Sequence, residues 1–391
     1  MKLRFWFLTI ASVISLSAKP LDVTVSAPSA ILMNAKTGAI LFEKEAHVRS
    51  YPASTTKIGT ALFALDHKKV LVDQKVTVSA EALRMKSSKQ SEALPYLLEK
   101  EGTMMWVMRG EILSYDALLH GLMLVSGNDA ANAIAEAISG TVPKFVEELN
   151  DYLQEIGCVH TQFRNPHGLH DSEHYTTAYD LCLMLRKAIQ IPKFRQIVST
   201  VSYNCPKTNK QPEREIRMTN PLIKPGKLYY PKAIGGKTGF TSKAMNALAF
   251  AAEQEGRTLV AVVLGCENRI DRYKDAIRLF ETAFAEKKEK RHLFGKENLF
   301  ERAIPGAKSA LKGAIEGELA LEFYPSEEPV CKAFVHWDDT SLPIRKGERV
   351  GELRILDSSG ALLQVQELRA LDEVKGTFWF NIKKIITPLF K

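Results

Sequence analysis

Three short motifs occur in a fixed order along this chain of 391 residues, and they constrain its fold more than any other feature. The first is S-T-T-K at 54–57, the second is S-G-N at 126–128, and the third is K-T-G at 237–239. A fold that uses all three must bring distant parts of the sequence into one cleft. A serine, two lysines and an amide in such a cleft predict a serine acyl-transfer site.

Each motif has a second copy elsewhere, so the sequence context must decide which copies matter. These copies are S-A-L-K at 309–312, S-Y-N at 202–204 and K-T-G at 36–38. Apolar residues follow Ser54 at helical spacing, which predicts a buried helix that begins at the serine and carries Lys57 one turn later. The K-T-G at 36–38 lies between two apolar runs and is typical of a hairpin turn. The K-T-G at 237–239 predicts an edge strand, where Gly239 lets a substrate backbone lie close alongside.

The residue types fit acyl transfer. A serine hydroxyl is a weak nucleophile at neutral pH, so Ser54 needs a base, and Lys57 is the nearest candidate. Lysine acts as a base only when it is neutral, a state that burial and a second nearby cation, Lys237, would favour. Lys237 and the hydroxyl of Thr238 would also bind a substrate carboxylate.

The second motif would complete the chemistry. Ser126 could relay a proton to the leaving amine, and the side-chain amide of Asn128 could bond the substrate amide or Lys57. The oxyanion needs preorganised donors, for which the backbone N–H groups of Ser54 and Phe240 are the candidates. Taken alone, S-G-N is more typical of a plain helix N-cap, and the order and context of all three motifs reverse that preference in favour of the catalytic interpretation.

The chain can be divided by its pattern. Residues 1–18 have a charged start, a short apolar run and small residues at their end, which predicts a secretory signal rather than a membrane span, since a span needs about 20 apolar residues. A mixed α/β pattern over 21–290 predicts the catalytic domain, and short alternating segments over 297–372 predict a small all-β domain. Residues 374–391 predict an amphipathic helix that lies on a membrane surface, or else packs on the protein's own core.

Charge and cysteine content exclude several classes. The net charge of +8 is accompanied by no nucleic-acid module, so a membrane surface is the better partner. The five cysteines are scattered and odd in number, which indicates buried thiols. His167, His170 and His174 are close in sequence but share no defined face, and we expect neither a metal site nor a cofactor there.

The wider motif contexts resemble the low-molecular-mass penicillin-binding proteins of the D-alanyl-D-alanine carboxypeptidase type (peptidase family S11). The segments that carry the resemblance are Y-P-A-S-T-T-K at 51–57, G-L-M-L-V-S-G-N-D-A-A at 121–131, N-P-H-G-L at 165–169, Y-T-T-A at 175–178 and K-T-G-F-T at 237–241. The resemblance implies an α/β transpeptidase-like (β-lactamase-like) domain, a small all-β domain and a terminal amphipathic anchor. It also implies export to the periplasmic face of the cytoplasmic membrane, stem peptides ending in D-Ala-D-Ala as substrates, and β-lactams as acylating inhibitors. Two departures are the polar, irregular segment 84–110 and Phe240, which stands where such enzymes often carry histidine.

The expected activity is therefore that of a serine D-Ala-D-Ala carboxypeptidase acting through an acyl-enzyme on Ser54. Two alternatives remain open at this point: a DD-endopeptidase that cleaves peptidoglycan cross-links with the same site, and a non-catalytic, membrane-tethered wall-binding protein. A β-lactamase is disfavoured, because the segment 165–168 has no acidic residue to drive fast deacylation.

Overall fold

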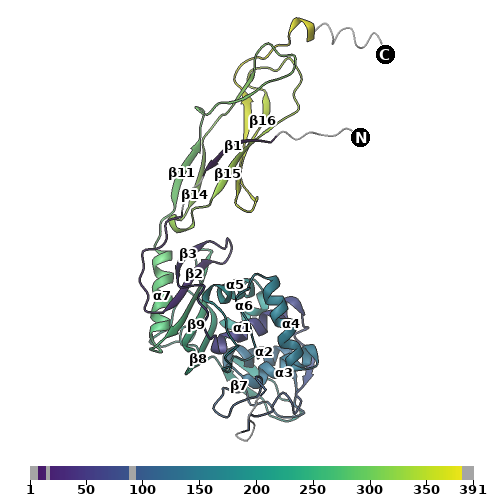
Figure 1. Cartoon of the computed structure of the whole chain (residues 1–391), viewed down its shortest axis with the longest axis vertical. Coiled ribbons are helices and arrows are strands. Elements are labelled where there is room, and N and C mark those ends of the chain that lie inside the picture. Colours follow the sequence, from purple (N-terminus) through teal and green to yellow (C-terminus); the bar gives the residue numbers. More distant parts are fainter. Residues whose placement is uncertain (1–7, 15–17, 88–93, 381–391) are drawn as a thin grey trace, which may run out of the picture. The chain divides into compact units, whose positions relative to one another are not determined.

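The computed structural model describes residues 8–14, 18–87 and 94–380. These residues form two compact units. The larger runs from Leu21 to Ala285, and the smaller contains the described residues before and after it (Figure 1). Each unit has its own hydrophobic core, so each is described by itself.

A five-stranded antiparallel sheet forms one layer of the larger unit, with the strand order β3-β2-β10-β9-β8. Its strands are β2 (Ser29–Asn34), β3 (Ile40–Lys44), β8 (Ala233–Thr241), β9 (Met245–Gln254) and β10 (Arg257–Cys266). Helix α7 (Asp271–Phe284) packs on one face, and a cluster of helices covers the other (Figure 1). Strand β8 is at the edge of this sheet, and the short helices over Ala53–Thr55 and Pro192–Ser199 pack against it. The edge strand and the hairpin at 36–38 predicted from the sequence are both confirmed.

The helical layer is built around one short buried helix. Its members are η1 (Ala53–Thr55), α1 (Thr56–Leu62), η2 (Phe63–His67), α2 (Tyr115–Leu124), α3 (Asn128–Ser139), α4 (Val142–Glu155), α5 (Ala178–Ala188) and α6 (Pro192–Ser199). All seven residues of α1 are buried. The helices around it begin at polar caps, since the side chains of Ser114, Thr141 and Thr177 each accept a backbone N–H at the start of α2, α4 and α5.

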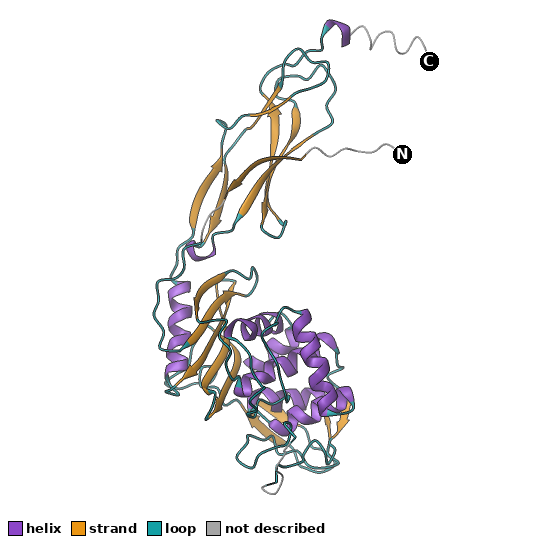
Figure 2. Ribbon diagram, viewed as in Figure 1, coloured by secondary structure: helices purple, strands orange, loops and turns teal. Residues whose placement is uncertain are grey.

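Two small antiparallel pairs lie beside this layer. They are β4 (Lys75–Thr77) with β5 (Ile112–Ser114), and β6 (Ser202–Cys205) with β7 (Arg214–Arg217). Strand β5 leads directly into α2, whereas the described residues between β4 and β5 are drawn mainly as loop in Figure 2.

The smaller unit is all-β, as expected from its alternating sequence. Six strands pair in the order β1-β15-β16-β17-β13-β12, and β11 pairs with β14. Their bounds are β1 (Leu8–Ile14), β11 (Glu289–Phe294), β12 (Phe300–Arg302), β13 (Leu311–Ile315), β14 (Leu319–Phe323), β15 (Cys331–Trp337), β16 (Arg349–Asp357) and β17 (Leu362–Ala370). The alternating burial of β15 places one face of the sheet on the core.

Both ends of the chain bear on the sequence analysis. Strand β1, inside the predicted signal segment 1–18, pairs antiparallel with β15, and the cleavage of that segment stays a prediction. The predicted terminal helix 374–391 is wrong at its start, because Val374 and Gly376 form β-bridges with Ile344 and Ala307 of the smaller unit. Residues 378–380 are helical, with Phe378 and Trp379 exposed, and residues 381–391 lie outside the described residues. Within the part of the chain that the structure describes, every helix is too short or too polar to cross a bilayer.

Candidate active site

The candidate nucleophile, Ser54, lies in a tight turn that leads into the buried helix. The turn η1 carries Ser54, and α1 begins two residues later, so Lys57 lies in its first turn. Ala53 has a positive φ of 48°, an unusual conformation for a residue with a side chain. Ser54 is half-buried and Lys57 is fully buried, so the serine is partly accessible to solvent while the neighbouring amine is hidden from water.

The amine of Lys57 is surrounded by three oxygen atoms. Its Nζ lies 3.1 Å from Ser54 Oγ, 2.7 Å from Asn128 Oδ1 and 2.6 Å from the carbonyl oxygen of His167. Burial, and next the charge of Lys237, hold the pKa of Lys57 well below its usual range, while Asp129 acts in the opposite direction. A neutral amine has two N–H donors and one lone pair. Because Asn128 and His167 accept the two donors, the lone pair is left to accept the proton of Ser54.

Strand β8 lies against the nucleophile from the sheet side. A Cβ atom added at Gly239 would lie 2.8 Å from the carbonyl oxygen of Pro52 and 3.2 Å from the nitrogen of Ser54. Contact this close requires glycine. The third motif thus meets the first at the edge of the sheet.

Lys237 is buried on the same strand. Its Nζ donates to the carbonyl oxygen of Thr238 at 2.9 Å. Burial, with the charge of Arg272 as the second cause, lowers the pKa of Lys237 to about 7. A charged lysine amine has three N–H donors, so this one bond to a carbonyl leaves donors that an anionic group could accept.

The second motif lies where α2 ends and α3 begins. Ser126 is 7% exposed and has a φ of 64°, another strained conformation for a residue with a side chain. Asn128 is the first residue of α3 and contacts Lys57 directly. The Ser126 hydroxyl takes part in none of the hydrogen bonds that hold Lys57.

The predicted donor at Phe240 has an exposed ring. Phe240 is 62% exposed, so its side chain is not packed into the site. The oxyanion role of the N–H groups of Ser54 and Phe240, and the relay role of Ser126, stay predictions.

Two buried histidines, His167 and His174, form hydrogen bonds close to the turn that carries Ser54. His167 Nδ1 accepts the N–H of Leu169 at 3.1 Å, so its Nε2 carries the proton and donates to the carbonyl of Tyr96 at 3.1 Å. Burial lowers the pKa of His167 to about 3, which keeps the ring neutral. His174 likewise accepts the N–H of Arg164 through Nδ1 and reaches Thr56 Oγ1 through Nε2 at 2.8 Å.

The expectation of no metal at these histidines stays a prediction. His170 packs edge-on against Tyr51, with ring centroids 4.7 Å apart. In the ranges that the structure describes, no three potential ligands gather into a metal-binding group.

Two contributing residues were missed by the sequence analysis. Arg272, on α7, donates through Nη1 to the carbonyl of Gly239 at 2.8 Å and is 4% exposed. The carboxylate of Asp129 accepts the backbone N–H groups of Met105, Val107 and Ala130. An arginine on an amphipathic helix reads as a surface residue, so the sequence carried no signal for the first. The aspartate directly follows the second motif, and this proximity could have drawn attention to it.

Comparison with solved structures identifies the class of protein to which this fold belongs. The chain is similar in structure to penicillin-binding protein 5 from Haemophilus influenzae, with a TM-score of 0.61, 26% sequence identity, and coverage of 92% of this chain and 100% of that one. A Streptomyces DD-transpeptidase matches with a TM-score of 0.59 and 29% identity over 68% of this chain and 100% of its own. The larger unit therefore has the transpeptidase fold of the penicillin-binding proteins.

Sequence comparison gives the family. Residues 15–268 match the family model described as D-alanyl-D-alanine carboxypeptidase, peptidase family S11, and the chain belongs to that family. Among its relatives are the D-alanyl-D-alanine carboxypeptidases DacF of Bacillus subtilis, 29% identical over 93% of this chain and 90% of that protein, and DacA of Haemophilus influenzae, 29% identical over 97% and 95%.

Proposed function

We propose that this protein is a serine-type D-Ala-D-Ala carboxypeptidase, which removes the terminal D-alanine from peptidoglycan stem peptides through an acyl-enzyme on Ser54. The observation that carries the proposal is the position of Lys57 Nζ, 3.1 Å from Ser54 Oγ and bonded on its other sides to Asn128 and His167. An amine with a lowered pKa and one remaining lone pair is suited to deprotonate a hydroxyl.

Acylation begins when the Ser54 hydroxyl gives its proton to Lys57 and its oxygen attacks the carbonyl carbon of the penultimate D-alanine. The negative charge on the carbonyl oxygen is stabilised by the backbone N–H groups of Ser54 and Phe240. The C–N bond then breaks, the proton passes from Lys57 by way of Ser126 to the leaving nitrogen, and free D-alanine departs. Its carboxylate is held until then by Lys237 and the hydroxyl of Thr238.

Deacylation repeats the sequence with water. Lys57 takes a proton from a water molecule, the hydroxide attacks the ester carbonyl, and the bond to Ser54 Oγ breaks as that oxygen regains its proton. A β-lactam presents a strained amide and a carboxylate to the same groups, so we expect it to acylate Ser54 and act as a covalent inhibitor.

The proposal includes a place in the cell. We infer export to the periplasmic face of the cytoplasmic membrane, with residues 374–391 as a peripheral anchor. Val374, at the start of this segment, is buried, but Phe378 and Trp379 farther along are exposed, which supports contact of this later part with a lipid surface. Removal of 374–391 should release the protein from the membrane fraction, and retention in that fraction would contradict the anchor.

The test of the activity is a pair of variants. Ser54→Ala should lose covalent labelling by a fluorescent penicillin and release of D-alanine, whereas Ser309→Ala, in the other S-x-x-K copy, should keep both. Undiminished labelling of Ser54→Ala would refute the assignment. Digestion of cross-linked muropeptides by the unaltered protein would instead show the endopeptidase activity left open by the sequence.

A further inference from the structure

Trp106 combines two features that rarely occur together. Its φ is 63°, and among the described residues it is the only aromatic residue with a positive φ. The residue is also 72% exposed. A bulky residue in this conformation is strained. Because the indole is not buried, packing does not offset this strain, and such uncompensated strain points to a function.

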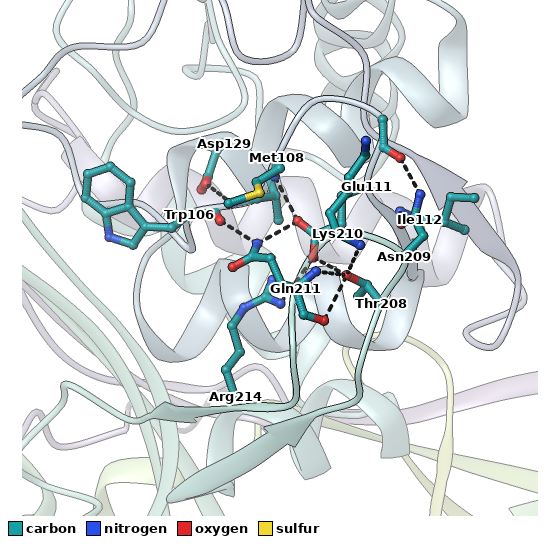
Figure 3. Close-up of polar contacts among 12 residues, drawn as sticks. Trp106, Met108, Glu111, Ile112, Asp129, Thr208, Asn209, Lys210, Gln211 and Arg214 are labelled. Atoms are coloured by element: carbon teal, nitrogen blue, oxygen red, sulfur yellow. Dashed lines mark hydrogen bonds and ion pairs between the residues drawn. The ribbon is translucent and has the colours of Figure 1, made fainter.

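The backbone around Trp106 is held on both sides. The N–H groups of Met105 and Val107 donate to the two carboxylate oxygens of Asp129, at 2.8 and 3.0 Å. The carbonyl oxygen of Trp106 itself accepts from Gln211 Nε2 at 2.8 Å (Figure 3). The strained conformation is therefore built into the loop by three separate hydrogen bonds.

The turn between β6 and β7 serves as the support. Gln211 Nε2 also donates to the buried carboxylate of Glu111, which accepts from Thr208 and Arg214 as well. Figure 3 shows this cluster on one side of Trp106, with the indole extending away from it. The indole is thus presented to solvent from a rigid base, and the cluster beneath it does not use the ring.

This base adjoins the second catalytic motif. The N–H of Asn128 donates to the carbonyl of Thr103 at 2.8 Å, and the Thr103 hydroxyl donates to the carbonyl of Ser126 at 2.7 Å. In the proposed function, the terminal carboxylate is bound at Lys237 on β8. With the substrate amide bonded to Asn128, the residue that precedes D-Ala-D-Ala is expected beside the second motif, whose backbone is bonded to Thr103 in the loop of Trp106.

We propose that Trp106 is a specificity-determining residue, whose indole packs against a long aliphatic side chain on the substrate residue that precedes D-Ala-D-Ala. The inference rests on the proposed function, because that function fixes the direction of the peptide. An indole face offers a large apolar surface at a low cost in side-chain entropy, and each methylene it covers adds binding energy. A glycine at the same substrate position has nothing to place on this surface.

The experiment compares two acylated tripeptides, Nε-acetyl-Lys-D-Ala-D-Ala and Gly-D-Ala-D-Ala. The unaltered enzyme should prefer the lysyl peptide by about tenfold in kcat/KM, as expected for several methylenes on an apolar surface. Trp106→Ala should reduce this ratio to about twofold or less, and Trp106→Phe should keep most of it. Leu71→Ala is the matched control, since Leu71 is 74% exposed in the same unit but follows the far end of the helix that begins near Ser54, and it should keep the full ratio.

A ratio unchanged in Trp106→Ala would overturn the inference, as would an equal loss of rate on both peptides. The same peptides are also tested as competitors of penicillin labelling, which reports binding without turnover. If no D-alanine is released but the lysyl peptide protects Ser54 in a Trp106-dependent way, the proposed hydrolysis fails and the contact stands. If D-alanine is released and Trp106 does not affect the ratio, the contact fails and the hydrolysis stands.

Discussion

Two regions of the larger unit contain the same kind of strained backbone: the centre of the site, around Ser54 and Lys57, and the loop of Trp106, which we call the rim. Ala53 and Ser126, at the centre, and Trp106, at the rim, all have positive φ values of 48–64°. At the centre the neighbouring side chains are buried, and burial changes the pKa values of the two lysines. At the rim the side chain is exposed and carries no charge. In this site, therefore, the two lysines proposed to act in the chemistry are buried, and the residue proposed to select the substrate is exposed.

The largest effect should come from removing the base. Lys57→Ala should lower the second-order rate of acylation by a penicillin by about 10³-fold or more, because general-base catalysis contributes about 10²–10⁴-fold and the oxygens of Asn128 and His167 lose their shared donor. Stopped-flow or gel-based labelling measures the rate. Lys36→Ala, in the hairpin copy of K-T-G, is the control and should acylate normally. An acylation rate of Lys57→Ala within tenfold of that of the unaltered protein would contradict the role of Lys57 as the base, and with it the difference in role between centre and rim.

The next effect tests how tightly the centre is packed. A Cβ at Gly168 would overlap the carbonyl of Ala53, so Gly168→Ala should displace the nucleophile turn, slow acylation by about 10²-fold and destabilise the fold by more than about 1 kcal/mol. Gly140→Ala is a matched control, because Gly140 also has a positive φ but has open space where the Cβ would be. It should cost about 1 kcal/mol in thermal unfolding and leave acylation unchanged. Equal acylation by the two variants would show that the contact at Gly168 does not shape the site.

The two lysines should give the activity a bell-shaped dependence on pH. Lys57 must be neutral, so kcat/KM should rise with pH through its lowered pKa, and Lys237 must be charged to hold the substrate carboxylate, so kcat/KM should fall above a pKa of about 7. D-alanine release from a short peptide, measured between pH 4 and 10, tests both limbs. The same peptide with an amidated C-terminus should lose the alkaline limb, since it has no carboxylate for Lys237. A rate that still rises at pH 9 with the acid would contradict the role of Lys237.

The sequence predicted the parts of the site that depend on residue type and local spacing. The helix that begins near Ser54 follows from its apolar periodicity, and the edge strand at Lys237 follows from its glycines and the apolar run after it. The carbonyl of His167 and the buried guanidinium of Arg272 could not be predicted, because any residue supplies a carbonyl and the burial of an arginine depends on tertiary packing.

The rim and the N-terminal strand show the same limit. Segment 84–110 was identified as an unusual, polar region, but its attachment to Asp129 depends on bonds to backbone N–H groups that leave no trace in residue type. Strand β1 depends on pairing with β15, which is distant in sequence, so a local pattern could not indicate it.

The smallest effect should come from the residue that joins centre and rim. Asp129→Asn keeps the shape of the side chain but removes its charge and one of the two oxygens that accept the N–H groups beside Trp106. Because the charge of Asp129 raises the pKa of Lys57, its loss should move the acid limb of penicillin acylation to lower pH. The looser loop should also reduce the preference for the lysyl peptide by about twofold to threefold. Glu136→Gln, farther along the same helix, is the control and should change neither quantity. If the peptide preference falls while the acid limb stays in place, Asp129 supports the rim alone. If the limb moves while the preference stays, the loop does not need its carboxylate anchor to present Trp106.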